Sequence, residues 1–539
     1  MDRWANVNGF YQIYPRSFRD SNGDGVGDLP GVIEKLDYIK GGQGALGIDA
    51  IWLSPFYPSP MADFGYDIKD YYDVDPMFGT LDDFRELLAQ AHQRDIKVMI
   101  DFVANHTSDE HAWFKASRSS RDNEKRDWYV WRDGRPDGSP PNNWLSVFGG
   151  SAWTLDEVTG QYYLHSFLDR QPDLNWENRE VRRAMREVMA FWLDMGVDGL
   201  RADAVRWLAK DSQFRDNPPN PAYDPARDDP YQAQLQRYSR FGDNLFAYLN
   251  ELTTLVEWYA DRIIVFEDYP DDHDKHLGAR NFQYLEFYRR INSHVALPFN
   301  FDGMFMDWSA ESFRNFVSTF QGSLMPGYVP AYCFGNHDQS RLATRFGQRQ
   351  ARLLALLQLT LPGLPVIYYG DEIGMEDVHI AAGDVQDAFE LQVPGKGLGR
   401  DPQRTPMQWS GESHMGFSIH QPWLPTPRDS GGHTVANQQL APDSELALYQ
   451  KLLELRRQHV VLRRGVYAEA TGNTPQVFAF SLQTQDDEAV VVLNFSDATV
   501  AYAVADTHRV VVASTLRPVE VQNGTVMLQP YEGLLLFKA

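Results

Sequence analysis

The chain has 539 residues, 43% of them hydrophobic, and a formal net charge of −24 at pH 7. This length exceeds one ordinary hydrophobic core, so we expect a large domain accompanied by one or two smaller ones. The acidic charge argues against a surface for nucleic acid or anionic membranes, and no hydrophobic run is long enough to span a bilayer.

Cysteine use and the amino-terminal residues indicate where the protein works. Cys333 is the only cysteine, which rules out an intrachain disulfide and fits a reducing compartment. Residues 1–6 contain neither a basic flank nor an apolar stretch, so we expect no secretory signal and a cytoplasmic location. A protein whose signal peptide had already been removed would look the same.

Short apolar, β-rich runs alternate with amphipathic helical stretches along most of the chain, which is typical of βα units. Hydrophobic side chains in 81–91 and 181–192 each fall on one helical face. Thr80 is placed to cap the first of these helices. Eight strands with helices between them predict an α/β fold, a (β/α)₈ barrel. The expected strands are 9–14, 50–54, 97–102, 199–203, 263–267, 296–301, 331–336 and 365–369.

Other parts of the chain interrupt the alternation. Residues 105–172, rich in Trp, Asp, Pro and Gly, are too many for a simple loop, so we expect a small inserted domain after the third strand. A second polar, Pro-rich excursion spans about 210–240, and after 463 only strands follow, which predicts a C-terminal β-sandwich. The expected domains are the barrel in two parts (1–104 and 173–462), the inserted domain (105–172) and the C-terminal domain (463–539).

Three acidic residues end strand-like runs: Asp203, Glu267 and Asp338. Parallel α/β barrels carry their chemistry at the C-terminal ends of their strands, so these carboxylates can converge although they are far apart in sequence. A nucleophilic carboxylate and a proton-donating one are what retaining glycoside hydrolysis requires. A lone Asp at a strand end is more often a helix cap, but the combination with Arg201 favours catalysis.

Six segments of the chain resemble signature segments of the alpha-amylase family of glycoside hydrolases. They occur in the family's order, each at an expected strand end or in its loop, and span nearly the whole chain. Four of them resemble the four signature regions of the family, and the other two resemble its oligo-1,6-glucosidase and α-glucosidase branch. The first four are 101–106, 199–203, 265–267 and 334–338, and the last two are 171–176 and 400–409.

The resemblance implies a role for each carboxylate. Asp203 would attack the anomeric carbon, and Glu267 would donate a proton and then act as the base. Asp338 would bind sugar hydroxyls more strongly as the ring flattens. Arg201, two residues before Asp203 on an extended strand, points to the same side and would keep that carboxylate ionised.

The resemblance also implies substrate-binding residues. His106 and His337 would donate hydrogen bonds to sugar hydroxyls, and Tyr66 would stack on the glucose face. Asp67 and Arg400 would form a pair that closes the far end of the pocket. Both histidines could instead be structural, and the aromatic residues could belong to the core. The residues expected to shape the pocket mouth are Phe148, Phe167 and Gln171.

An acidic loop near the amino terminus matches the first part of an EF-hand loop. Position 12 is Gly31 where an EF-hand has an acidic residue, so no EF-hand helix pair is expected. Similar α-glucosidases hold a structural Ca²⁺ or Mg²⁺ in such a loop, which implies the same ion here; the alternative is a turn without metal. The expected ligands are Asp20, Asn22, Asp24, Val26 and Asp28.

These observations predict a retaining, exo-acting α-glucosidase with glucosyl-transfer capacity and no organic cofactor. Its partners would be a small α-glucoside and a hydroxyl acceptor, not nucleic acid or membrane, and it would be a monomer or homodimer. Ala204 follows the nucleophile; in the similar branch Val there accompanies α-1,6 specificity, so we expect α-1,4 bonds such as that of maltose to be cleaved. Alternatives are a glucosyl isomerase of trehalose-synthase type and an α-1,6-specific oligo-glucosidase. A different kind of alternative is a non-catalytic binding subunit of a membrane transporter, because some family members have that role. Those members lack the catalytic carboxylates and carry a membrane anchor, whereas this chain has the carboxylates and no hydrophobic run long enough for an anchor, which argues against that alternative.

Overall fold

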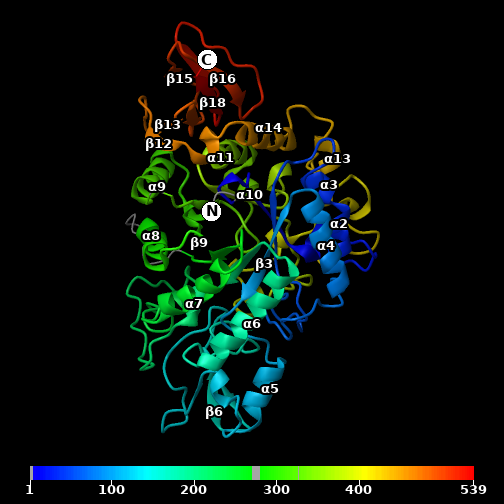
Figure 1. Cartoon of the computed structure of the whole chain (residues 1–539), viewed down its shortest axis with the longest axis vertical. Coiled ribbons are helices and arrows are strands. Elements are labelled where there is room, and N and C mark those ends of the chain that lie inside the picture. The colour runs from blue at the N-terminus through cyan, green and yellow to red at the C-terminus, as the bar shows by residue number, and fades with distance from the viewer. Residues whose placement is uncertain (1–3, 270–279, 326, 539) are drawn as a thin grey trace.

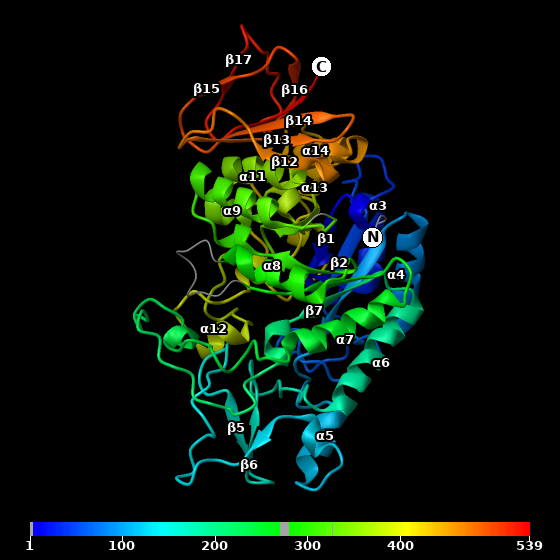
Figure 2. The same cartoon turned by 60° about the vertical axis from the view of Figure 1, so that its left-hand side comes forward.

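The computed structural model describes residues 4–269, 280–325 and 327–538. Residues 1–3, part of the segment expected to lack a secretory signal, lie outside the described residues. The molecule is elongated, with a small sheet at one end, a barrel in the middle and β-sheets from the C-terminal part at the other end (Figures 1 and 2). Among the described residues, no helix combines the length and the apolar character needed to cross a bilayer.

A closed barrel of eight parallel strands forms the centre, in the order β1-β11-β10-β9-β8-β7-β3-β2. This confirms the predicted (β/α)₈ fold. Its register pairs Asp101 with Arg201 and Val103 with Asp203, so the polar strand ends emerge at one rim. The strands are β1 (Phe10–Ile13), β2 (Ala50–Leu53), β3 (Lys97–Val103), β7 (Gly199–Asp203), β8 (Ile263–Phe266), β9 (Ala296–Asn300), β10 (Ala331–Cys333) and β11 (Leu364–Tyr368).

Amphipathic helices surround the barrel and bury their apolar faces against it. Helix α4 begins with a capping box in which Thr80 and Asp83 each accept from the other's backbone, as the sequence predicts for Thr80. Helix α6 is capped by Asn178 and ends at Gly196, whose left-handed φ of 114° suits glycine. The longer helices are α4 (Leu81–Gln93), α6 (Arg179–Met195), α7 (Leu245–Glu257), α8 (Arg280–Ile291), α9 (Ala310–Ser323), α11 (Gln348–Thr360) and α14 (Glu445–Gln458).

The segment after β3 forms helix α5 (Ala112–Ser119) and a three-stranded sheet of order β4-β6-β5. A buried cation joins this segment to the barrel: Nζ of Lys210 lies 3.0 Å from Oδ1 of Asn105 and 2.7 Å from Oδ2 of Asp173. Burial lowers the pKa of Lys210, although Asp173 opposes this. The strands are β4 (Trp131–Arg132), β5 (Trp153–Asp156) and β6 (Gln161–Leu164).

The C-terminal part is all β, as predicted, with a five-stranded sheet and a two-stranded sheet. It packs on the barrel: the indole of Trp308, after β9, donates to the backbone oxygen of Phe495 at 2.9 Å. The larger sheet contains β12 (Val466–Glu469), β13 (Val477–Gln483), β14 (Glu488–Asn494), β18 (Gly533–Lys538) and β16 (His508–Ala513), and the smaller contains β15 (Val500–Ala503) and β17 (Thr525–Leu528).

Candidate active site

A pocket of about 650 Å³ opens at the C-terminal rim of the barrel. Asp203 ends β7, Glu267 directly follows β8, and Asp338 lies in the loop after β10; all three side chains line the pocket. The tertiary structure therefore brings together the three carboxylates that are separated in sequence.

The guanidinium of Arg201 contacts two of these carboxylates. Its Nη1 lies 2.7 Å from Oδ1 of Asp203, and its Nη2 lies 2.5 Å from Oε1 of Glu267. It also contacts Asp101 of the neighbouring strand, and its side chain has no exposed surface. The other oxygen of Glu267 accepts a 2.8 Å hydrogen bond from the backbone N–H of Ala204. Both carboxylates are thus held in fixed positions in the lining of the pocket.

The protonation of Asp203 is set by opposing effects. Burial raises the pKa of Asp203 well above its ordinary value, and the nearby Glu267 raises it further, while Arg201 lowers it. Arg201 therefore acts in the predicted direction, opposing the effects of burial and of Glu267 on the pKa of Asp203. One protonated and one ionised carboxyl group are what a proton donor beside a nucleophile requires.

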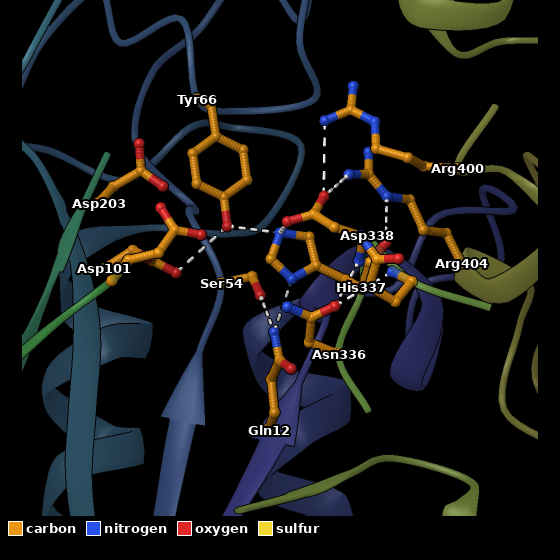
Figure 3. Close-up of polar contacts among 12 residues, drawn as sticks. Gln12, Ser54, Tyr66, Asp101, Asp203, Asn336, His337, Asp338, Arg400 and Arg404 are labelled. Carbon is orange, nitrogen blue, oxygen red and sulfur yellow. Dashed lines mark hydrogen bonds and ion pairs between the residues drawn. The ribbon is translucent and has the colours of Figure 1, made fainter. Parts of the chain in front are cut away.

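Asp338 lies in a more positive environment than Asp203. Nη2 of Arg404 is 2.7 Å from its Oδ1, and Nη1 of Arg400 is 3.6 Å from the same atom; both contacts are drawn in Figure 3. Burial acts to raise the pKa of Asp338, but the fixed charges of Arg404 and Arg400 help to hold it well below its usual range. Asp338 is therefore an ionised hydrogen-bond acceptor at neutral pH.

His337 is locked between two side chains. Its Nδ1 lies 2.8 Å from Nε2 of Gln12, and its Nε2 lies 2.8 Å from the hydroxyl of Tyr66 (Figure 3). The two rings of this second pair are nearly parallel, with an interplanar angle of 2° and centroids 5.5 Å apart. Burial lowers the pKa of His337 to about 3, so the imidazole is neutral. Tyr66 and His337 both line the pocket.

Arg400 pairs with a different acid from the one predicted. Nη2 of Arg400 lies 2.7 Å from Oδ1 of Asp63 and 2.6 Å from Oδ1 of Asp387. Asp63 and Arg400 line the pocket. The prediction that Asp67 pairs with Arg400 is therefore wrong.

Asp67 instead stabilises the loop that carries Asp63. Its carboxylate accepts hydrogen bonds of 2.8–2.9 Å from the hydroxyl of Ser59 and from the backbone N–H groups of Ala62 and Asp63. Burial raises the pKa of Asp67 to about 6. The sequence offers two acids within this short segment, and only the loop geometry decides which carboxylate faces Arg400.

Gln171 lies behind the pocket, which corrects its predicted place at the mouth. Its side chain is fully buried, and Nε2 is 3.1 Å from Oδ2 of Asp63 and 3.1 Å from Nε2 of His106. It therefore positions two pocket-lining residues. Burial lowers the pKa of His106 to about 4, so this histidine is neutral as well.

Aromatic rings form the wall near the mouth. Phe148 and Phe167 both line the pocket, as the sequence predicts, with their centroids 6.3 Å apart. The guanidinium of Arg400 lies 5.0 Å from the centroid of Phe148.

Several lining residues are absent from the prediction. Some of these lining residues come from the Pro-rich excursion after β7. The sequence of this excursion has no regular period, so it does not predict in which direction the side chains point. The one sequence signal that this excursion belongs to the pocket is that a long loop follows a strand that carries a catalytic residue. The others lie in loops or short helical segments between barrel strands, where no motif marks them. These additional lining residues include Trp207, Asp229, Tyr231, Arg240, Tyr269, Phe305, Ser340, Asp377 and Phe389.

The predicted metal loop forms a series of tight turns. Asp20 accepts from the backbone N–H groups of Asn22, Gly23 and Gly25 at 2.6–3.1 Å, and Asp28 caps helix α2 (Leu29–Glu34) by accepting from a backbone N–H. Asp24 accepts likewise from a neighbouring N–H at 2.8 Å. Within the described part of the chain, no three His, Cys, Asp or Glu side chains converge to hold a metal ion. In this conformation, backbone N–H groups satisfy the carboxylates.

Known proteins resemble the chain along nearly its whole length. Residues 12–465 match the family described as alpha amylase, catalytic domain. An oligo-1,6-glucosidase of Heyndrickxia coagulans is 37% identical, with 100% of each chain aligned. A probable alpha-glucosidase of Rhizobium meliloti is 40% identical over 90% of this chain and 88% of that protein. The crystal structure of the alpha-glucosyl transfer enzyme XgtA matches with a TM-score of 0.91 at 38% identity, covering 99% of both chains.

Proposed function

Because the chain belongs to the alpha-amylase family of glycoside hydrolases, we propose that it is a retaining, exo-acting α-glucosidase that releases a terminal glucose unit. The carboxylates of Asp203 and Glu267, both bound to one buried Arg201, carry this proposal. The Asp63–Arg400 pair supports the exo mode, because a closed far end leaves room for a chain terminus but not for a continuing chain.

The mechanism is double displacement. Asp203 attacks the anomeric carbon while Glu267 gives its proton to the leaving oxygen, which breaks the glycosidic bond and forms a covalent glucosyl-enzyme. In the second step Glu267, now ionised, takes a proton from an acceptor hydroxyl that attacks the same carbon and releases Asp203. Asp338, ionised through its arginine neighbours, accepts hydrogen bonds from the sugar as positive charge develops on the ring.

The acceptor in the second step is water or another hydroxyl group. Similarity to an enzyme described as an alpha-glucosyl transfer enzyme supports a capacity for transfer. The aromatic side chains near the mouth, Phe148, Phe167 and Trp207, favour it, because they limit water and offer faces on which a sugar acceptor can stack.

The preferred linkage is α-1,4, as in maltose. The small side chain of Ala204 lines the pocket beside the nucleophile and leaves room for the second sugar ring. The names of the similar proteins are compatible with either α-1,4 or α-1,6 bonds, so an α-1,6-specific oligo-glucosidase and a glucosyl isomerase remain the alternatives.

The remaining parts of the proposal are a cytoplasmic location, based on the single cysteine, and a structural divalent ion in the loop from Asp20 to Asp28. The composition of this loop supports the ion, and the carboxylate oxygens that accept from backbone N–H groups keep further lone pairs with which to bind it.

Incubation with maltose, isomaltose, sucrose and trehalose separately, followed by chromatography of the products, tests the function. We expect glucose and transfer oligosaccharides from maltose, with much slower release from isomaltose. Conversion of maltose to trehalose without an equivalent release of glucose would establish the isomerase alternative. Proton NMR of the first product should show the α-anomer, because two displacements retain configuration.

A further inference from the structure

Tyr269 lies in the pocket between two of the carboxylates, outside the family segments quoted above. It follows Glu267 by two residues and lines the pocket together with Asp338. Its ring packs on Phe301, with centroids 4.6 Å apart, so its direction is fixed. Burial and the charges of Asp338 and Glu267 raise the pKa of Tyr269 well above its ordinary value, and the hydroxyl keeps its proton.

The hydrogen bonds of Asn336 determine where that proton can point. Oδ1 of Asn336 accepts from the backbone N–H groups of Asp338 and Gln339 at 3.0 and 3.1 Å, which fixes the orientation of the amide. Its Nδ2 therefore faces the hydroxyl of Tyr269, at 2.6 Å, and donates to it. Asn336 and Asp338 are drawn in Figure 3. Because the phenolic oxygen already accepts from Asn336, its own O–H must donate in another direction.

One acceptor on the pocket surface is only loosely engaged by this O–H. Oδ2 of Asp338 is 3.5 Å away, beyond the range of a well-formed O–H···O hydrogen bond. The hydroxyl of Tyr66 differs in this respect, because it is 2.8 Å from Nε2 of His337. A half-buried donor and an ionised acceptor thus face one another across a gap on the pocket surface.

We propose that Tyr269 is a further substrate-binding residue, whose O–H donates to the glucose hydroxyl that itself donates to Asp338. A sugar hydroxyl can accept one hydrogen bond and donate another, so it completes a chain from Asn336 through Tyr269 to the sugar and Asp338. Each hydrogen bond in such a chain polarises the next. The chain would strengthen the grip of Asp338 on the reacting ring. This inference rests on the proposed α-glucosidase function.

Tyr269→Phe tests the proposal because it removes only the hydroxyl and keeps the packing on Phe301. The probes are 4-nitrophenyl α-D-glucoside and its 2-deoxy and 3-deoxy analogues, and kcat/KM is measured for each with wild type and variant. We expect an about tenfold loss on the parent glucoside, as for one lost hydrogen bond. On the analogue that lacks the bridging hydroxyl, the loss should be less than twofold, because the partner of Tyr269 is already missing.

Comparing substrates within one variant keeps the test decisive, since a partly unfolded preparation lowers all three values equally and leaves their ratios unchanged. Tyr288→Phe is the matched control: that hydroxyl is buried, donates to the backbone oxygen of Val329 at 3.0 Å and is not part of the pocket lining, so kcat/KM should match wild type on every probe. Equal losses by Tyr269→Phe on all three glucosides, or none on the parent, would overturn the role of Tyr269. Failure of wild type to hydrolyse the parent would overturn the proposed function and this inference with it.

Discussion

The backbone N–H of Ala204 donates a 2.8 Å hydrogen bond to Oε2 of Glu267, so the residue after the proposed nucleophile also holds the proposed proton donor. Ala204 adopts a left-handed conformation, with φ of 49° and ψ of 37°, as Glu267 receives this bond. Such strained backbone often occurs at functional sites. Any change at this position therefore affects the space beside Asp203 and the position of Glu267 together.

Replacing Ala204 with Val tests the linkage preference. We expect wild type to use maltose far better than isomaltose. Ala204→Val should shift the ratio of the two kcat/KM values towards isomaltose, by an amount equivalent to about 1–3 kcal/mol. A β-branched residue is disfavoured at positive φ, so the free energy of unfolding should also fall, by about 1–3 kcal/mol. Ratios of kcat/KM for the two disaccharides and thermal melting measure these effects. Ala204→Gly keeps the N–H and relieves the strain, so it should retain the preference for maltose; a wild-type preference for isomaltose would contradict the argument.

Asp203→Asn should abolish turnover while the fold persists. The amide has nearly the same shape but cannot act as a nucleophile, so kcat should fall by several orders of magnitude. Steady-state kinetics with maltose and a circular dichroism spectrum check the two parts. If the variant keeps more than a tenth of wild-type activity, Asp203 is not the nucleophile.

Glu267→Gln should affect substrates according to their leaving groups. Loss on maltose should be nearly as severe as for Asp203→Asn, but much smaller on an aryl glucoside whose leaving group needs no protonation. With the aryl substrate, glucosyl-enzyme should accumulate because the base for the second step is missing, and intact-protein mass spectrometry would detect it. Equal loss of the first step on both substrates would count against Glu267 as the acid.

Asp63→Asn and Asp67→Asn should separate binding from folding. Asp63 pairs with Arg400 at the closed end of the pocket, so its replacement should lower kcat/KM for maltose about tenfold or more with little change in melting temperature. The two carboxylate oxygens of Asp67 accept three loop hydrogen bonds between them, and Asp67→Asn replaces one of these oxygens by an NH2 group that cannot accept, so it should lower the melting temperature first. Our assignment would be reversed if Asp67→Asn lost activity without losing stability and Asp63→Asn did neither.

The acidic loop should bind one divalent ion that stabilises the fold without taking part in catalysis. Removal of the ion by a chelator should lower the melting temperature, because a ligand bound only to the native state stabilises it. Elemental analysis of the purified protein gives the metal content. If Asp24→Ala leaves both metal content and melting temperature unchanged, the loop is a turn held by its own hydrogen bonds.

The sequence by itself determined the barrel and its reacting groups. The apolar runs that form β3, β7 and β8 are local patterns, set by side chains that alternate or remain buried within a few residues. Asp203 and Glu267 could be located because a residue at the end of a parallel strand must lie at the C-terminal rim, whatever the rest of the chain does.

The tertiary structure alone decided the directions of the loop side chains. Whether Asp63 or Asp67 faces Arg400 depends on hydrogen bonds within one loop and on a partner more than 300 residues away. Gln171 turned out to be buried behind the pocket, and Tyr269 is aimed by Asn336 from another strand end. Loop residues have no period that fixes their direction, so their orientation follows from contacts between segments that meet only in the folded barrel.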